Sequence, residues 1–417
     1  MHLLSRILSN REHRLFKDLL KALSLVLDLA LDQKQQHSLR VAVACVQIGA
    51  ESGLPATALR DLFYAGLLHD IGEIGLLDEL QGDQNQHPAA GARIVSLIPS
   101  LAQAAESIRH HQERFDGSGF PAKLRGEQIP LSSQILALCN AVDSIAFATG
   151  PLENNPRAIP RDQVLHALDS WKGSRFEPGL VSSYAGILRR GAVWDMSEFS
   201  EKHWKNLKLD IIDMSYLIDL EEINYLEVTL KVFATIIDTK HRYTQGHSQR
   251  VAEFARILSR TLALSVEQER QIYYAGFLHD AGKVCVSRQV LDKPSKLSDM
   301  EWKMIADHPR NSRMIIEKIS SLEVESEIAG YHHERFDGRG YPFGLKGEEI
   351  PIGSRIMAVA DSYDAMTSQR SYRISLSHED AIEEIIRCSG QMYDPKVVEA
   401  FSSIPAGILN EAAQNTL

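Results

Sequence analysis

A long segment of this 417-residue chain occurs twice. YAGLLHD ends at Asp70 and YAGFLHD ends at Asp280, 210 residues later. ERFDG recurs at Glu113 and Glu334, 221 residues apart, so the second copy contains eleven additional residues after its His-Asp pair. A repeat of this length indicates two large domains that each bury a core, and it argues against a solenoid of short units.

Both copies, and the segment between them, have the patterning of helices. HSLRVA at His37 and HSQRVA at His247 are again 210 residues apart. Apolar residues recur at helical spacing from Leu207 to Asp238, whereas the alternation typical of strands is rare. DGSGFP and DGRGYP have the Gly and Pro content of loops. We therefore predict an all-α fold of two tandem helical bundles, residues 1–195 and 225–417, joined by a helical connector at residues 196–224.

Charge and composition exclude several classes of protein. Lys and Arg number 45 against 55 Asp and Glu, and the net charge of −10 disfavours non-specific binding to duplex nucleic acid. The most apolar early stretch, Ala22 to Leu31, contains Asp28 and is too short for an integral membrane segment. The four cysteines are far apart, which argues against a disulfide framework and a thiolate zinc site. We expect a cytoplasmic protein.

The second copy contains an ordered series of histidines and aspartates. Any one of them is more often a hydrogen-bonded core or surface group than a ligand. However, 24 to 32 residues separate each group from the next, which is one passage from helix to helix. Imidazoles and carboxylates without thiolates suit divalent Fe, Mn or Zn. The predicted metal ligands are His247, His279, Asp280, His308, His332, His333 and Asp361.

Asp280 is the expected catalytic centre of this series. Its two oxygens can bridge two metal ions, and such a pair activates a shared water as hydroxide for attack on phosphorus. The implied reaction is the hydrolysis of a phosphodiester. Lys283 is one turn beyond His279, where an ammonium can bind a substrate phosphate, although a single lysine is usually a solvated charge. The neighbours His332 and His333 can converge only if their helix ends or kinks there.

The motifs of the second copy together resemble those of HD-GYP domains, the branch of the HD phosphohydrolases that cleaves cyclic dinucleotides. They are HSQRV, HDAGK, His308-Pro309, HHERFDGRGYP and ADSYDAMTSQRSYR. The resemblance implies that His247, His279, Asp280 and Asp361 hold one metal and that Asp280, His308, His332 and His333 hold the other. It also implies that Lys283 contacts phosphate, and it makes Arg370 and Arg373 weaker candidates for substrate contact, since both are equally explained as surface charges.

Two further positions refine this resemblance. Some family members use a Glu four residues before the first histidine for a third metal, and Tyr243 stands there instead. We therefore expect two divalent metal ions. Iron and manganese are the preferred metals, and other divalent metals stay open. Gly340, Tyr341 and Pro342 indicate a shaped loop more than a catalytic element, because Gly permits unusual dihedral angles and Pro fixes them.

The first copy is a degenerate version of the second. It retains His37, His69, Asp70, His87 and His111 at the equivalent positions. Gln112, Asn140 and Glu73 replace His333, Asp361 and Lys283, so each expected metal position loses one ligand and the phosphate pocket loses its cation. We predict that the first domain does not catalyse and has a structural or regulatory role. Whether Glu73 substitutes as a ligand and keeps a metal there stays open.

The sequence therefore predicts a metal-dependent phosphodiesterase with catalysis in the second domain. The family resemblance makes cyclic di-GMP the default substrate, with pGpG or GMP as product, and 3',3'-cyclic GMP-AMP is the alternative. A non-catalytic signalling or binding module is the competing class, and a mononucleotidase is disfavoured by the GYP loop. We expect the two repeats to pack against each other. A homodimer or a signalling protein as a further partner stays open, as does the input signal.

Overall fold

The computed structural model describes residues 18–20, 22–24, 26–28, 37–75, 84–146, 160–190, 225–239, 246–319, 322–368 and 375–414. The chain divides into two compact units, one containing residues 23–223 and the other residues 224–417. The boundary between the units falls at the end of the predicted connector, residues 196–224, which lies outside the described residues. Helix α11 (Tyr225–Thr239) begins directly after it and contains the end of the apolar pattern found from Leu207 to Asp238.

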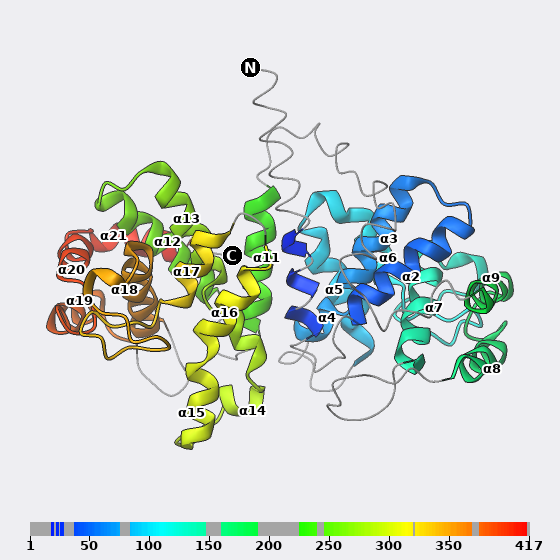
Figure 1. Cartoon of the computed structure of the whole chain (residues 1–417). Helices are drawn as coiled ribbons and strands as arrows, with labels where there is room; N and C mark the ends of the chain where they lie inside the picture. The colour runs from blue at the N-terminus through cyan, green and yellow to red at the C-terminus, as the bar shows by residue number, and fades with distance from the viewer. Residues whose placement is uncertain are drawn as a thin grey trace. The chain divides into compact units, whose positions relative to one another are not determined.

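The described residues form helices, turns and two isolated β-bridges, without a β-strand, so the predicted all-α class is confirmed. Among the described helices, none has both the length and the hydrophobicity to cross a bilayer. The helices of the first unit, drawn from blue to green in Figure 1, are α2 (His37–Glu51), α3 (Ala56–Leu68), α4 (Ile71–Gly75), α5 (His87–Ser96), α6 (Ala102–Arg109), α7 (Leu131–Ala146), α8 (Arg161–Trp171) and α9 (Pro178–Arg189).

The second unit repeats this order (Figure 1). After α11 its helices are α12 (His247–Thr261), α13 (Val266–Leu278), the 3-10 helix η7 (Ala281–Cys285), α14 (Arg288–Leu291), α15 (Asp299–Ala306), α16 (His308–Ile316), α17 (Glu323–Gly330), α18 (Ile352–Thr367), α19 (His378–Arg387), α20 (Pro395–Ser402) and α21 (Ala406–Gln414). Helices α2 and α12 have 15 residues each and α3 and α13 have 13 each, so the sequence repeat is a repeat of structure.

Local sequence explains where these helices begin. The hydroxyl of Ser265 accepts a hydrogen bond from the Gln268 amide, and the Gln268 side chain accepts one from the Ser265 amide, a reciprocal cap that starts α13. Asp394 caps α20 with a single hydrogen bond that its carboxylate accepts from the Lys396 amide, and Pro395 occupies the first turn, where its missing N–H costs nothing.

The core of the second unit lies between α12, α13, α18, α19 and α20. Val251, Phe254, Ala255 and Leu258 follow helical spacing along one face of α12, and all are buried. Gly276 of α13 lies directly against this helix: a Cβ built there would be 2.5 Å from the Cα of Ala252. The glycine therefore lets the two helices approach closely. Because α12 begins with His247 and α13 ends just before the His-Asp pair, this contact fixes the distance between two parts of the candidate site.

Candidate metal centre

The predicted ligands come from the ends of several helices. His247 begins α12, His279 and Asp280 follow the end of α13, and His308 begins α16. His332 and His333 lie in the turn after α17, which ends at Gly330, while Asp361 lies within α18. Ends of helices are where a side chain can turn inward without the constraint of helical spacing. The end of α17 therefore lets the two neighbouring histidines converge, as the sequence analysis required.

Asp280 is at the middle of the cluster. Its Oδ2 lies 3.6 Å from Nε2 of His247 and 3.5 Å from Nε2 of His279. Its Oδ1 lies 3.2 Å from Nε2 of His308 and 4.0 Å from Nε2 of His332. The two oxygens of one carboxylate therefore face two different groups of imidazoles.

The remaining predicted ligands complete these two groups. Oδ1 of Asp361 lies 3.3 Å from Nε2 of His247, on the side of Oδ2 of Asp280. The ring of His333 lies 4.1 Å from that of His332 and 5.0 Å from that of His308, measured between centroids. His308, His332 and His333 each offer a ligand atom within 4.8 Å of the others, as do His247, His279 and Asp280. The structure thus brings together all seven predicted ligands.

Main-chain carbonyls hold three of the rings in one orientation. Nδ1 of His279 lies 2.8 Å from the Gly276 carbonyl oxygen, and Nδ1 of His308 lies 2.7 Å from that of Ile305. His332 makes the same contact with Ala329 at 2.6 Å. A carbonyl oxygen can only accept a hydrogen bond, so each Nδ1 carries the proton and each Nε2 presents a lone pair to the cluster. This is the arrangement in which histidine binds metals.

Several polar atoms of the cluster have no hydrogen-bond donor available to them. Within the described part of the chain, Nε2 of His279 and Oδ1 of Asp280 are buried and have no hydrogen-bond partner. Nε2 of His308 and Nε2 of His332 lie 3.3 Å apart, although neither carries a proton to share when Nδ1 is protonated. Buried acceptors that face one another are unfavourable unless a cation lies between them. The residues present therefore fit divalent metal ions.

The electrostatics of the cluster suit a cation as well. Burial alone raises the pKa of Asp280, but the Lys283 ammonium and the His279 ring outweigh burial and hold that pKa well below its usual range. Burial and the neighbouring His333 hold the pKa of His332 well below its usual range, and burial lowers the pKa of His333 to about 3. At neutral pH the carboxylate is therefore ionised while these two imidazoles are neutral, which are the forms that bind metals.

Lys283 reaches the cluster from η7. Its Nζ lies 2.5 Å from Oδ2 of Asp280, and its side chain is 22% exposed. The ammonium thus borders both the predicted metal ligands and the outside of the site, a position from which it can attract a phosphate. The weaker candidates Arg370 and Arg373, and Tyr243 at the third-metal position, lie outside the described residues.

The sequence analysis missed Asp364 and Arg250. Oδ2 of Asp364 accepts a hydrogen bond from Nδ1 of His247 at 2.7 Å, and Oδ1 accepts one from Nε of Arg250 at 2.6 Å. Asp364 therefore orients the first histidine. Burial alone lowers the pKa of His247, but the carboxylates of Asp361 and Asp364 raise it to about 10. A signal was present in ADSYDAM, because aspartates three residues apart share one face of a helix.

The loop after His333 is stabilised by hydrogen bonds to a buried carboxylate at its start. The Glu334 carboxylate accepts hydrogen bonds from the backbone amides of Phe343, Gly344 and Leu345 at 2.7, 3.1 and 3.0 Å. A Cβ on Gly340 would lie 2.3 Å from the Arg335 nitrogen, so this glycine is required by close approach and not by an unusual dihedral angle, which corrects the expectation for that position.

Tyr341 packs against one of the predicted metal ligands, which a residue that only shapes the loop would not need to do. Its ring lies 5.0 Å from that of His333, measured between centroids. The loop therefore contacts a predicted ligand through Tyr341, and it limits the positions that the half-buried His333 ring can take.

The comparisons with known proteins agree with this geometry. A family model described as "HD domain" matches residues 2–179 and 231–397. The chain belongs to the HD domain family. It contains two HD domains, as the repeat predicted.

Relatives of this HD protein have named activities. It is 30% identical over 368 residues to the "3'3'-cGAMP-specific phosphodiesterase 1" of Vibrio cholerae, which covers 81% of this chain and 84% of that protein. It is 40% identical to a "Cyclic di-GMP phosphodiesterase" of Pseudomonas aeruginosa over 66% of this chain and 62% of that protein.

A solved structure has the same fold. It is the crystal structure of a cyclic GMP-AMP-specific phosphodiesterase of V. cholerae, V-cGAP3, which has a TM-score of 0.63 and 24% identity. The match covers 96% of this chain and 97% of that one.

The first HD domain retains the shape of the cluster. Nε2 of His37 lies 3.7 Å and Nε2 of His69 lies 3.1 Å from Oδ2 of Asp70, and Nε2 of His87 lies 3.4 Å from Nε2 of His111. His37, His69 and Asp70 form one group with metal-ligand spacing, and Asp70, His87 and His111 form another. The five residues retained in sequence are therefore also retained in space.

The substituted positions of the first HD domain have different chemistry. Nε2 of the Gln112 amide lies 3.3 Å from Nε2 of His111, in place of a third imidazole. Oδ1 of Asn140 accepts a hydrogen bond from Ser144 at 3.4 Å. Burial and the charge of Asp70 raise the pKa of Glu73 to about 7, so this carboxyl is partly protonated at neutral pH and a weaker ligand than an ionised one.

Proposed function

We propose that this chain hydrolyses a phosphodiester bond of a cyclic dinucleotide and that catalysis takes place in the second HD domain. The observation that carries this proposal is the position of Asp280, whose two oxygens face two separate groups of imidazoles. Relatives that match over most of the chain are named cyclic GMP-AMP phosphodiesterases, and another is named a cyclic di-GMP phosphodiesterase.

The proposed cofactors are two divalent metal ions, with iron or manganese preferred because the donors are imidazoles and carboxylates. His247, His279, Asp280 and Asp361 would hold one ion, and Asp280, His308, His332 and His333 the other. When bound, such ions make water a better nucleophile and stabilise the negative charge that develops on the phosphate oxygens.

The protein itself prepares this site in three ways. The carbonyls of Gly276, Ile305 and Ala329 keep the Nε2 atoms of three histidines unprotonated and directed inward. Asp364 orients His247. Lys283, at the edge of the cluster, would attract a phosphate of the substrate and hold it beside Asp280.

Cyclic di-GMP and 3',3'-cyclic GMP-AMP should both be tested as substrates. The family resemblance makes cyclic di-GMP the default, whereas the two relatives that match over 81% and 88% of this chain are named for 3',3'-cyclic GMP-AMP. We place the reaction in the cytoplasm, because the four cysteines are free thiols. The packing of the two repeats and a homodimer or protein partner stay predictions.

The decisive experiment is a chromatographic assay of the full chain, purified without oxygen and supplied with iron or manganese. We expect linear or mononucleotide products from at least one cyclic dinucleotide, and a loss of at least about a thousandfold in kcat for Asp280→Ala. Removal of the metals with a chelator should abolish turnover, and their return should restore it. A native rate for Asp280→Ala would refute this site. Binding without any product would favour the signalling module instead.

A further inference from the structure

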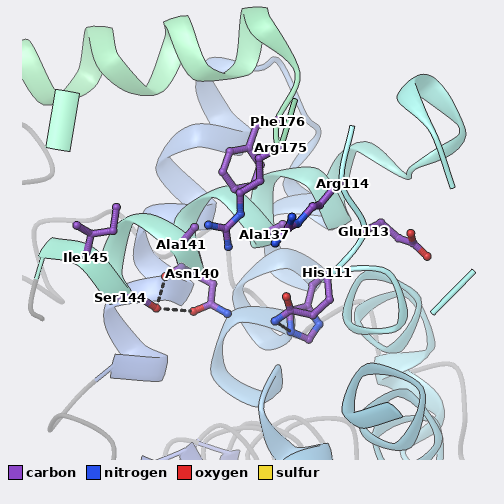
Figure 2. A pocket seen from close by; sticks show the side chains of 11 residues that line it. His111, Glu113, Arg114, Ala137, Asn140, Ala141, Ser144, Ile145, Arg175 and Phe176 are labelled. Carbon is purple, nitrogen blue, oxygen red and sulfur yellow. Dashed lines mark hydrogen bonds between the residues drawn. The ribbon is translucent and has the colours of Figure 1, made fainter. Parts of the chain in front are cut away.

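The first HD domain contains a pocket beside its degenerate cluster. The pocket has a volume of about 370 Å³ and lies next to His111 and the two amides that replace metal ligands, Gln112 and Asn140. Figure 2 shows the side chains of Arg114 and Arg175 directed into the same space as Asn140. A pocket of this size holds more than a single phosphate group and is in the range of sites for small organic ligands.

Aromatic rings hold Arg175 in position. Its guanidinium carbon lies 5.0 Å from the centroid of the Trp171 ring and 5.1 Å from that of Phe176. A cation over an aromatic ring is held without a hydrogen bond, so these contacts do not use the N–H groups of Arg175, which can donate to an acceptor in the pocket. Among the described residues, no carboxylate forms an ion pair with Arg175.

Backbone hydrogen bonds place the two arginines next to each other. The amide of Phe115 donates to the Arg175 carbonyl at 3.1 Å, and the amide of Asp116 donates to the Ser174 carbonyl at 2.9 Å. The segment that carries Arg175 is thereby fixed beside Arg114. The charge of Arg114, together with burial, lowers the pKa of Arg175, so the two cations are close enough to repel each other. An anion between them would relieve this repulsion.

The second domain has a different arrangement at the equivalent position. There the amide of Phe336 donates to the Met392 carbonyl at 3.1 Å, which makes Met392 the structural counterpart of Arg175. The counterpart of Arg114 is Arg335, which is paired with Asp337 at 2.7 Å. The first domain has therefore gained one cation. Asp116, the counterpart of Asp337, accepts a hydrogen bond from the Ser118 amide instead; its hydrogen bonds with Ser118 and the charge of Arg114 lower its pKa, but among the described residues it forms no ion pair with Arg114. In addition, Asn140 has replaced an aspartate.

The acidic residue that lines the pocket does not cancel these charges. The Glu113 carboxylate accepts hydrogen bonds from the backbone amides of Ala122 and Leu124 at 2.6 and 3.1 Å, and Figure 2 shows it directed away from the arginines. The Ser144 hydroxyl donates to the main-chain carbonyl of Asn140 at 2.8 Å and lies 3.4 Å from its side-chain oxygen, and neither contact uses the amide N–H groups of Asn140. The pocket thus offers donors and positive charge where the second domain offers metal ligands.

We propose that this pocket binds the terminal phosphate of a nucleotide and does not hydrolyse it. Two guanidinium groups match a phosphate monoester, whose charge at neutral pH approaches −2, better than a diester with a single charge. The amides of Gln112 and Asn140 and the hydroxyl of Ser144 provide hydrogen-bonding groups for the rest of the molecule. The choice of a nucleotide rests on the proposed function, because the linear and mononucleotide products of that reaction end in such a phosphate.

The test is isothermal titration calorimetry on the full chain carrying Asp280→Asn, which blocks turnover. We expect 5'-GMP to bind at least about tenfold more tightly than guanosine or inorganic phosphate. Arg175→Met, which introduces the residue of the second domain, should weaken GMP binding about tenfold or more, and so should Arg114→Gln. Asn140→Asp should weaken it too, since it returns a negative charge without changing volume.

Two controls locate the bound ligand. Arg335→Gln changes the counterpart of Arg114 in the second domain, and Arg109→Gln changes a surface arginine outside the pocket; each should leave GMP affinity within about twofold. Unchanged affinity in both Arg175→Met and Asn140→Asp, with native circular dichroism, would overturn the proposal. So would equal affinity for GMP and inorganic phosphate, or loss of binding with Lys283→Met alone. Failure of the catalytic assay refutes only the proposed function, because this titration requires no turnover.

Discussion

At the residue scale, the second HD domain depends on a single carboxylate surrounded by oriented imidazoles. Asp280 was identifiable from the sequence because it belongs to a repeated motif. Asp364 was not identified, although its spacing from Asp361 was visible, because its role is defined by a contact with His247 across 117 positions of the chain. Such second contacts fix the tautomer and direction of a ligand, and their loss typically lowers metal affinity or activity by about 10- to 100-fold.

Asp364→Asn tests this positioning role. We expect metal affinity to fall by about 10- to 100-fold, because a neutral amide replaces the charged acceptor that orients the His247 ring and pairs with Arg250. Excess metal should restore much of kcat, whereas it should not rescue Asp280→Ala. Turnover measured against metal concentration provides the readout, with the exposed Glu383→Gln as a control. Equal metal dependence in Asp364→Asn and the parent chain would contradict the role.

Glu325 provides a pH-dependent prediction away from the metal cluster. It is 3% exposed, and burial raises its pKa to about 7. The unfolded chain ionises this carboxyl near pH 4.5, so the folded state holds an extra proton between about pH 4.5 and 7 and loses stability as the pH rises through that range.

We therefore expect Glu325→Gln to raise the free energy of unfolding by about 1–3 kcal/mol at pH 8 and to have little effect at pH 4.5 or below, because the amide cannot ionise. Urea denaturation at the two pH values measures this difference. Glu327→Gln, on the exposed side of the same helix, is the matched control and should change neither value. A gain in stability that is equal at both pH values would show that ionisation of Glu325 is not its cause.

At the scale of the element, helix ends and close helix contacts determine the site. The motif YAGFLHD contains both: Gly276 permits the contact between α12 and α13, and the same helix then ends at His279 and Asp280. Gly66 is in the same position in the first domain, where a Cβ would lie 2.4 Å from the Cα of Ala42. The repeated glycine is thus explained by packing and does not require a catalytic role.

Gly276→Ala should lower the free energy of unfolding by about 1–3 kcal/mol, since the added methyl group meets backbone atoms that must move. Metal affinity should fall with it, because the shift separates His247 from His279. Gly407→Ala is the control: that glycine is in α21 with open space around it, and alanine there should be neutral or stabilising. Chemical denaturation compares them. A fully stable Gly276→Ala would disprove the close-contact argument.

At the scale of the whole molecule, two copies of one fold have diverged in chemistry. The apolar residues and glycines that build the helices are retained in both, whereas the substitutions at Gln112, Asn140 and Glu73 fall within the cluster of the first copy. Fold is maintained by burial, which tolerates these exchanges, while metal binding requires particular donor atoms. The proposed division of roles, with turnover in the second domain and ligand binding in the first, matches this divergence.

This division predicts unequal responses to the same change. Asp70→Asn should leave kcat within about twofold, whereas Asp280→Asn should remove turnover, because only the second domain has the full ligand set. Metal analysis of the parent chain should find about two ions per chain, both lost in Asp280→Asn. About four ions per chain, or a large loss of kcat in Asp70→Asn, would show that the first domain also holds metals or catalyses.

Residue types and their spacing along the chain were enough to predict the helical class, the duplication and the seven candidate ligands. The split of histidines across the Asp280 oxygens, the role of Asp364 and the proximity of Arg114 to Arg175 became visible only in the folded chain. Those features depend on atoms that are distant in sequence and meet only when helices pack. Gly340 shows the same distinction. The sequence shows that a glycine is present, but only the fold shows why: a neighbouring backbone occupies the space that a Cβ would need.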